Sequence, residues 1–264
     1  MENERIEETV GSWMQEIGLR DPAGAGIPAP LSFAGGGRWQ REIRGVRTVQ
    51  ELKRLAAEAG EAGAIPDRVV IGKELSRMTE PEVEALAGAA AGYGLTAVFP
   101  LGEAVRDEVA LREAVCCAVR AAGCGAGAFQ VKSHSLLWLL GRARATGLLP
   151  AGVRFTFDAA AEAAGAKVLQ DLGADAVIAA PGRKIGTLAA LRAAVWIPLV
   201  CRIGGRGSAG SLARLSLLAE GIRIASPVIL SFAWPKETPG ESAPGLETQR
   251  LFRELARLKE RIGR

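Results

Sequence analysis

The sequence predicts an α/β protein built as one closed (β/α)8 barrel of the TIM type, and three observations favour this fold. The length of 264 residues matches the roughly 250 residues typical of a single barrel. Short runs rich in β-branched and aromatic residues alternate with helical stretches rich in Ala, Leu, Glu and Arg, which is typical of a parallel sheet. We count eight such runs, and about eight strands close a small barrel so that no edge strand remains.

The expected strands are bounded by loops that carry Gly, Pro or charged residues. They are residues 30–34, 68–73, 95–101, 127–132, 153–158, 175–180, 197–203 and 227–232. The first is followed by a Gly-Gly-Gly run and a long polar stretch before the first barrel helix. No Gly-x-Gly-x-x-Gly motif follows an early strand, so the sequence does not favour a doubly wound dinucleotide-binding sheet.

The expected helices begin with recognisable caps. Thr48 and Thr79 are each followed three residues later by Glu, the pattern of a capping box. The helices are residues 48–59, 79–91, 107–122, 135–146, 159–172, 185–195, 208–220 and 246–262. A further helix at 4–17 precedes the barrel, so we predict that residues 1–28 pack as helix and loop on a barrel formed by residues 29–264.

Composition excludes several functional classes. No apolar run approaches about 18 residues, so no membrane-spanning helix is expected. The acidic start of the chain is unlike a basic signal peptide, which predicts a cytoplasmic protein. The net charge of +4 comes without a Lys/Arg cluster interleaved with aromatics, so no nucleic-acid groove is expected. The expected partner is a small-molecule substrate, and a homo-oligomer is compatible with the sequence.

The loop after the seventh strand carries a pattern that favours anion binding. Its glycines let backbone N–H groups approach an anion at the start of a helix, and an arginine adds a bidentate donor. Many barrels hold a substrate phosphate after strands seven and eight. The predicted anion site is Gly204, Gly205, Arg206, Gly207 and Ser208. The alternative is a glycine-rich turn with a capping serine and no ligand.

Lysines gather at the predicted catalytic face. Four of the seven, Lys73, Lys132, Lys184 and Lys236, fall just after strands. A lysine that ends a buried strand is desolvated on one side, which favours the neutral amine and Schiff-base chemistry. Lys132 is the first candidate nucleophile and Lys73 the second. The alternative is an ion pair between either lysine and Glu103 or Asp158.

Carboxylates and the only histidine follow the same strands. Glu103 and Asp158 are the candidate proton shuttles, and His134 is the only imidazole for acid–base work near neutral pH. Together with Glu74 they also form an oxygen-rich set that could hold Mg²⁺ or another divalent metal. His134 has the alternative role of a helix-capping or surface residue. The four cysteines lack metal-site spacing and are expected to be reduced thiols.

The segment Leu-Gly-Ala-Asp-Ala-Val-Ile-Ala-Ala-Pro-Gly at 172–182 resembles the sixth-strand segment of many phosphate-binding and aldolase-type barrels. The resemblance is confined to this segment and points to no single family. We therefore predict a lyase of aldolase-like type that acts on a small anionic carbonyl metabolite, with no organic cofactor. The alternatives are a divalent-metal-dependent isomerase or lyase, and a barrel that binds a ligand or partner without catalysis.

Overall fold

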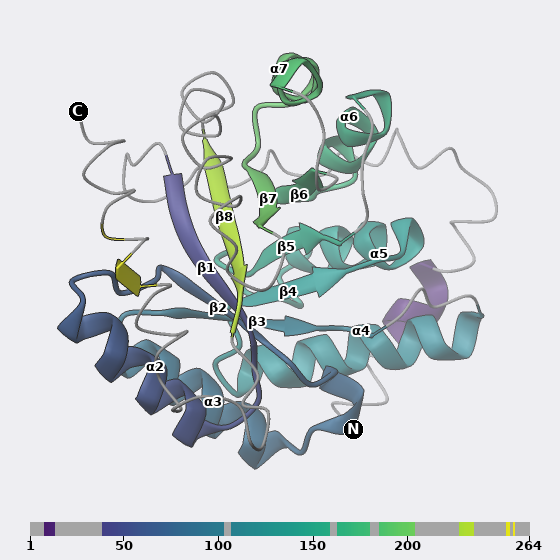
Figure 1. Ribbon diagram of the computed structural model, residues 1–264. Coiled ribbons are helices and arrows are strands. Elements are labelled where there is room, and N and C mark those ends of the chain that lie inside the picture. Colours follow the sequence, from purple (N-terminus) through teal and green to yellow (C-terminus); the bar gives the residue numbers. More distant parts are fainter. Residues whose placement is uncertain are drawn as a thin grey trace.

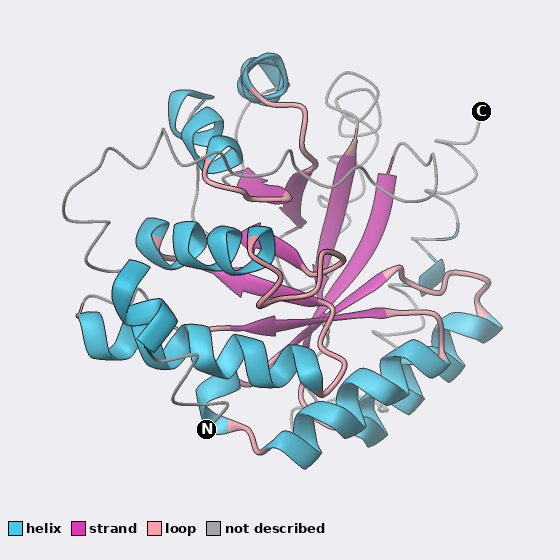
Figure 2. Cartoon of the chain, turned by 180° about the vertical axis from the view of Figure 1, so that it is seen from behind, coloured by secondary structure: helices cyan, strands magenta, loops and turns pink. Residues whose placement is uncertain are grey.

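The described residues form a closed barrel of eight parallel strands, in which β8 pairs back to β1 and the helices lie outside the ring (Figures 1 and 2). The predicted fold class is therefore confirmed. The structure is a computed structural model, and the residues it describes are 8–13, 39–102, 107–158, 163–179, 185–203, 227–234, 252, 253 and 256.

Each described strand runs parallel to its neighbours in sequential order. The strands are β1 (Trp39–Val46), β2 (Arg68–Ile71), β3 (Thr96–Pro100), β4 (Ala128–Val131), β5 (Arg154–Phe157), β6 (Ala176–Ala179), β7 (Leu199–Ile203) and β8 (Val228–Ala233). The helices between them are α2 (Val49–Glu61), η2 (Leu75–Arg77), α3 (Glu80–Gly92), α4 (Glu108–Gly123), α5 (His134–Ala145), α6 (Ala163–Asp171) and α7 (Ile185–Ala194).

The first strand corrects the sequence prediction. β1 is Trp39–Val46, whereas the segment expected to be the first strand, 30–34, lies outside the described residues. β1 pairs with β2 and β8 along most of its length, so it closes the barrel. It carries polar side chains on both faces, which is why its composition did not resemble a barrel strand.

The outward faces of the strands pack under the helices. Phe99, Phe129, Phe155 and Phe157 are fully or almost fully buried there, in a cluster that includes Leu136, Leu137 and Leu139 of α5. The helices begin at caps that the sequence predicts. The Thr48 hydroxyl accepts from the Glu51 N–H at 3.1 Å, and a capping box starts α3 at Thr79. Apolar burial of this kind supplies most of the driving force for folding.

The interior of the barrel holds buried charge. Arg68 Nη2 donates to Thr156 Oγ1 at 2.9 Å, and because β2 and β5 are not neighbours this bond crosses the inside of the barrel. Arg68 Nε lies 3.4 Å from Glu42 Oε2. Burial lowers the pKa of the Arg68 guanidinium, and the Glu42 carboxylate opposes that shift. Above this layer the inward side chains Val70, Val98 and Ala128 form a small apolar cluster.

The Asp of the Gly-Ala-Asp turn before β6 is structural. Asp175 Oδ2 accepts from Arg144 Nη1 at 2.6 Å and from the Phe155 N–H at 2.7 Å. Arg144 also donates to the carbonyls of Val153 and Gly173. Arg144 and Asp175 are both buried. Each of them also forms hydrogen bonds to the backbone, and such bonds help to offset the cost of burying the two charges.

Residues 8–13 are helical and lie beside α4 and α5. Val10 and Trp13 are buried in the main core, and the Arg142 guanidinium of α5 lies 5.7 Å from the centroid of the Trp13 ring. The expected helix 208–220 lies outside the described residues, and of 246–262 only residues 252, 253 and 256 are described, all helical. Within the described part of the chain, no helix is both long and apolar enough to cross a membrane.

Candidate active site

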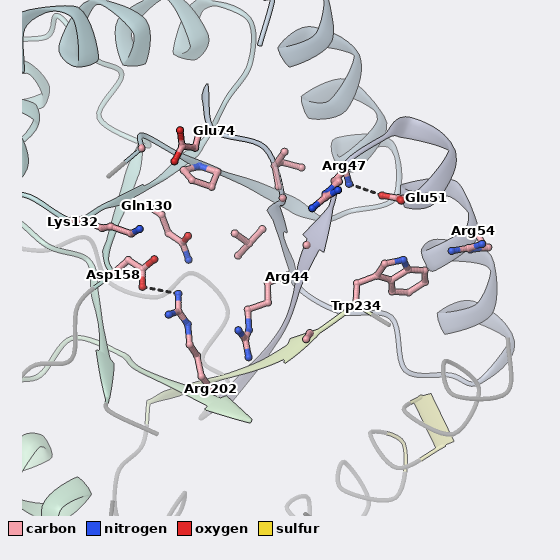
Figure 3. A pocket seen from close by; sticks show the side chains of 17 residues that line it. Arg44, Arg47, Glu51, Arg54, Glu74, Gln130, Lys132, Asp158, Arg202 and Trp234 are labelled. Atoms are coloured by element: carbon pink, nitrogen blue, oxygen red, sulfur yellow. Dashed lines mark hydrogen bonds and ion pairs between the residues drawn. The ribbon is translucent and has the colours of Figure 1, made fainter. Parts of the chain in front are cut away.

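A polar cavity of about 720 Å³ opens at the carboxyl ends of the strands (Figure 3). This is the end at which barrels of this type place their active sites, and the volume suits a small metabolite. The labelled side chains around it are Arg44, Arg47, Glu51, Arg54, Glu74, Gln130, Lys132, Asp158, Arg202 and Trp234. Five of these are cationic and three are anionic, so the described lining favours an anionic ligand.

Lys132 lies between β4 and α5 at the mouth of the cavity. β4 ends at Val131, and the Ser133 hydroxyl caps α5 by accepting from the Leu136 N–H at 3.3 Å. Lys132 is exposed, which corrects the expectation that the strand end desolvates it. Its side chain extends into the cavity toward Asp158, and within the described residues it forms no ion pair (Figure 3).

Asp158 is held by an arginine rather than by a lysine. Asp158 Oδ1 lies 2.6 Å from Arg202 Nη2, and their side chains are 12% and 28% exposed. The Asp158 N–H donates to the Val131 carbonyl at 2.7 Å, which continues the β4–β5 ladder and fixes the carboxylate above the barrel. Of the sequence interpretations of Asp158, the proton shuttle and the metal ligand remain proposals, and the ion pair with Lys132 is not formed.

Arg44 stands next to Arg202 on the cavity floor. Burial lowers the pKa of the Arg44 guanidinium, and the charge of Arg202 lowers it further, while Glu42 and Asp158 act in the opposite direction. The Gln130 side chain is 6% exposed and also faces this floor (Figure 3). Two guanidinium groups, one carboxylate and one amide therefore converge at the base of the cavity.

One wall of the cavity is aromatic. Trp234 is buried against Phe252, with ring centroids 6.5 Å apart, and the Arg54 guanidinium lies 5.4 Å from the Trp234 ring centroid. The backbone N–H of Trp234 donates to the backbone carbonyl of Arg44 at 2.7 Å, and this hydrogen bond joins the end of β8 to β1. At the rim, the Glu51 carboxylate accepts from the Arg47 N–H at 2.6 Å.

The ends of β1 and β2 approach closely at two glycines. Gly45 has φ +101° and lies at a bulge in β1, a conformation that favours glycine. A Cβ placed on Gly72 would lie 2.8 Å from the Gly45 carbonyl oxygen. The close approach fixes the strand that carries Arg44.

Two of the candidate residues lie away from the cavity lining. Lys73 Nζ bonds to Glu82 Oε1 of α3 at 2.8 Å, so the expectation that Lys73 shares a cleft with Lys132 and Asp158 is wrong. The alternation along the strand turns Gly72 inward and Lys73 outward. His134 begins α5 and lies against Phe157, with ring centroids 4.9 Å apart, on the outer face of β5.

The remaining candidates are only partly described. Glu103, Lys184, Lys236 and the loop 204–208 lie outside the described residues. Glu74 lines the cavity with Asp158, but in the described ranges no three His, Cys, Asp or Glu side chains are grouped to hold a metal ion. The four cysteines are free thiols, and burial raises the pKa of Cys201 to about 11.

Comparison with known proteins identifies the fold but no family. No protein-family description and no curated protein matches the sequence. Native KDPGal is 14% identical, with a TM-score of 0.56 over 88% of this chain and 99% of its own. Truncated 3-deoxy-D-arabino-heptulosonate 7-phosphate synthase from Thermotoga maritima is 17% identical, with a TM-score of 0.54 over 91% and 95%. The YdjI aldolase of Escherichia coli K12 is 14% identical, with a TM-score of 0.52 over 86% and 90%. These identities show a shared TIM-barrel fold alone.

Proposed function

We propose that this protein is an aldolase-like lyase acting on a small anionic carbonyl compound, with Lys132 as nucleophile. The observation that carries the proposal is the placement of Lys132 and Asp158, from neighbouring strands, in one cationic cavity. Lysine amines form Schiff bases with carbonyl substrates. An aldolase and a synthase of phosphorylated sugar acids are among the structural neighbours, which adds a likeness at the level of the fold.

The proposed reaction uses the chain's own groups. Lys132 Nζ adds to the substrate carbonyl carbon and loses water, which gives an iminium. The bond between the α and β carbons of the iminium then breaks, and its electron pair forms an enamine with the Lys132 nitrogen. Protonation of this enamine at its α carbon and hydrolysis by water then release the second product and free Lys132. Asp158 accepts the proton of the hydroxyl group on the departing fragment, which leaves as an aldehyde or ketone. The Arg202 guanidinium lies 2.6 Å from the Asp158 carboxylate and positions it for this step.

Chemical trapping tests the proposal. The protein is incubated with a panel of 2-oxo acids and sugar-derived aldehydes, reduced with borohydride and weighed by intact-protein mass spectrometry. We expect a stable adduct that Lys132→Ala abolishes and Lys73→Ala retains, because Lys73 lies outside the cavity lining. An adduct that persists in Lys132→Ala, or none with any carbonyl, would contradict the proposal.

The loop 204–208 is the proposed site for a second anionic group, such as a phosphate, because it combines glycines with Arg206 and Ser208. Phosphate should raise the melting temperature of the wild-type protein by mass action. Gly205→Asp places a carboxylate where the anion would bind and should remove this effect. Equal stabilisation of the variant by phosphate would dismiss the loop as an anion site.

A divalent metal is a second candidate, favoured by the two carboxylates Glu74 and Asp158 on one cavity. Carboxylate oxygens are the ligands that Mg²⁺ prefers. The other members of the predicted set are Glu103, outside the described residues, and His134, on the outer face of β5. Metal content of the purified protein, measured with and without chelation, decides between this route and the lysine route when compared with the trapping result.

A further inference from the structure

Two glutamine side chains are buried in the described part of the chain, and only one of them has hydrogen-bond partners there. Gln170 of α6 is 3% exposed, and its Oε1 accepts from the backbone N–H groups of Trp196 at 2.9 Å and of Ile197 at 3.4 Å. Gln130 of β4 is 6% exposed, and its side-chain amide forms no hydrogen bond to any described residue. Buried polar side chains are nearly always hydrogen-bonded, so the amide of Gln130 calls for a partner.

The side chains around Gln130 inside the barrel leave its amide free. In the register of the strands, Gln130 is paired with Pro100 of β3 and with Thr156 of β5. The proline side chain has no polar atom, and Thr156 Oγ1 already accepts from Arg68 Nη2 at 2.9 Å. Two residues earlier on the same face of β4, Ala128 belongs to the small apolar cluster of the interior. The open side of the amide is the cavity, into which the Gln130 side chain points (Figure 3).

Gln130 and Lys132 come from the same face of one strand. Successive side chains of a strand alternate between faces, so residues two apart lie on one face with their Cα atoms about 6.6 Å apart. Both side chains line the cavity and point into it (Figure 3). An amide offers hydrogen-bond donors and an acceptor but no charge, so it suits a neutral oxygen of a ligand. A carbonyl group placed for attack by the Lys132 amine has its oxygen near the Gln130 amide.

We propose that the Gln130 amide binds the substrate carbonyl oxygen, at the carbon to which Lys132 adds. This role rests on the proposed function, which assigns the attack to Lys132. As the bond between nitrogen and carbon forms, the π electron pair of the carbonyl moves to the oxygen, and an N–H of Gln130 stabilises the developing negative charge. The oxygen then takes one proton from the amine nitrogen and one from solvent, and it leaves as water.

Nuclear magnetic resonance of the side-chain amide tests this site without Schiff-base chemistry. The sample is isotope-labelled Lys132→Ala protein, and adding Gln130→Met identifies the signals of Gln130. Pyruvate and dihydroxyacetone phosphate are the probes, and acetate and inorganic phosphate are the matched anions without a ketone. We expect at least one ketone probe to shift the Gln130 signals saturably and by more than its matched anion. No saturable shift with either ketone, or an equal shift with the matched anion, would overturn the proposal.

The rate of adduct formation tests the same group in the reactive protein. Gln130→Met keeps the length of the side chain and removes its polar atoms. We expect this variant to form the borohydride-trapped adduct about 10²-fold more slowly than the wild type, which is the effect of removing one donor from a developing oxyanion. Gln170→Met, outside the cavity lining, should react at the wild-type rate. A wild-type rate in Gln130→Met would overturn the proposal.

Urea unfolding separates a binding role from a structural one. In the protein without substrate the Gln130 amide is buried without a described partner, so Gln130→Met should keep or raise the urea midpoint. Gln170→Met is the matched control, because it leaves the backbone N–H groups of Trp196 and Ile197 without their acceptor and should lower the midpoint. A drop in Gln130→Met as large as that in Gln170→Met would show that Gln130 supports the fold instead.

The outcomes distinguish failure of the carbonyl site from failure of the proposed function. Lys132→Ala should lose the borohydride adduct and keep the ketone-induced shift of the Gln130 signals. That shift, together with no adduct in the wild type, would support Gln130 as a carbonyl-binding residue and contradict the lysine mechanism. An adduct at Lys132 that forms equally fast in Gln130→Met would support the lysine mechanism and contradict the role of Gln130.

Discussion

Asp158 Oδ1 and Arg202 Nη2 lie 2.6 Å apart and join the carboxyl ends of β5 and β7 across the end of β6. The pair brings together two strands that are not neighbours, and it sets the position of the carboxylate that we propose as the proton shuttle. Its energetic role and its chemical role can be measured separately.

Asp158→Asn and Arg202→Gln should each lower the free energy of unfolding by about 1–2 kcal/mol, because each leaves a largely buried charge without its partner. The cost should stay below that of a fully buried pair, since Arg202 is 28% exposed. The double variant should recover part of the loss. Asp158→Asn should also lower turnover by about 10²–10⁴-fold. Urea unfolding and turnover of the trapped substrate class provide both readouts, and additive stability losses would show that the two groups do not interact.

Glu82 predicts a pH dependence of stability. The Lys73 amine, followed by the Thr79 N–H, holds the pKa of the Glu82 carboxyl at about 2, below its ordinary 4.5. A lowered pKa contributes stability that is complete above about pH 4.5 and is lost as the pH falls toward 2. The wild type should therefore melt above Glu82→Gln at pH 6, and the gap should close toward pH 2. A gap that is independent of pH would show that this carboxylate is not responsible.

Among the ion pairs between described residues, breaking the buried pair Arg144–Asp175 should lower the free energy of unfolding most. Both residues are buried, at 6% and 3% exposed, and Arg144 also holds two carbonyl groups. Arg144→Met should lower the free energy of unfolding by about 3–5 kcal/mol, because it leaves the Asp175 carboxylate buried without a cation. Lys167→Gln, which breaks an exposed pair with Asp171, is the matched control and should change stability little. Equal losses of unfolding free energy in Arg144→Met and Lys167→Gln would show that the buried pair is no more costly to break than the exposed one.

Gly72→Ala should destabilise the barrel at the strand that carries Arg44. The added Cβ would lie 2.8 Å from the Gly45 carbonyl oxygen, and backbone must move to accommodate it. Overpacking of this kind costs about 1–3 kcal/mol. Gly88→Ala in α3 meets open space and should instead stabilise by about 0.5–1 kcal/mol, as expected for glycine in a helix. Chemical denaturation of both variants checks the sign, and a neutral Gly72→Ala would show that β1 and β2 are not closely held here.

The sequence could predict most of the strands because their outward faces are apolar. Phe155 and Phe157 alternate with inward Thr156, and such runs between helices indicate a barrel strand. β1 was not predicted, because Glu42 and Arg44 face inward and Arg41 faces outward, where it pairs with Asp67. A strand whose partners are charges inside the barrel lacks the apolar signal that marks the others.

The sequence placed a residue at the candidate site only where it also predicted the end of the strand that carries the residue. Lys132 and Asp158 follow β4 and β5 directly, so their place at the cavity follows from the fold. Arg44 was missed with its strand. Arg202 lies inside the predicted seventh strand, but its pairing with Asp158 depends on the register of β5, β6 and β7, which the sequence pattern does not give. Lys73 was wrongly expected to face the cavity. Successive side chains of a strand point to opposite faces, so Lys73 points outward where Gly72 faces inward.

In the proposed reaction, Lys132 carries the substrate as a covalent imine. The most direct measurement is peptide mapping of the borohydride-reduced adduct, formed with a 2-oxo acid and digested for tandem mass spectrometry. We expect the added mass to lie on the peptide containing Phe129–Ser133, at Lys132. Modification of Lys73, Lys184 or Lys236 with Lys132 unmodified would contradict it.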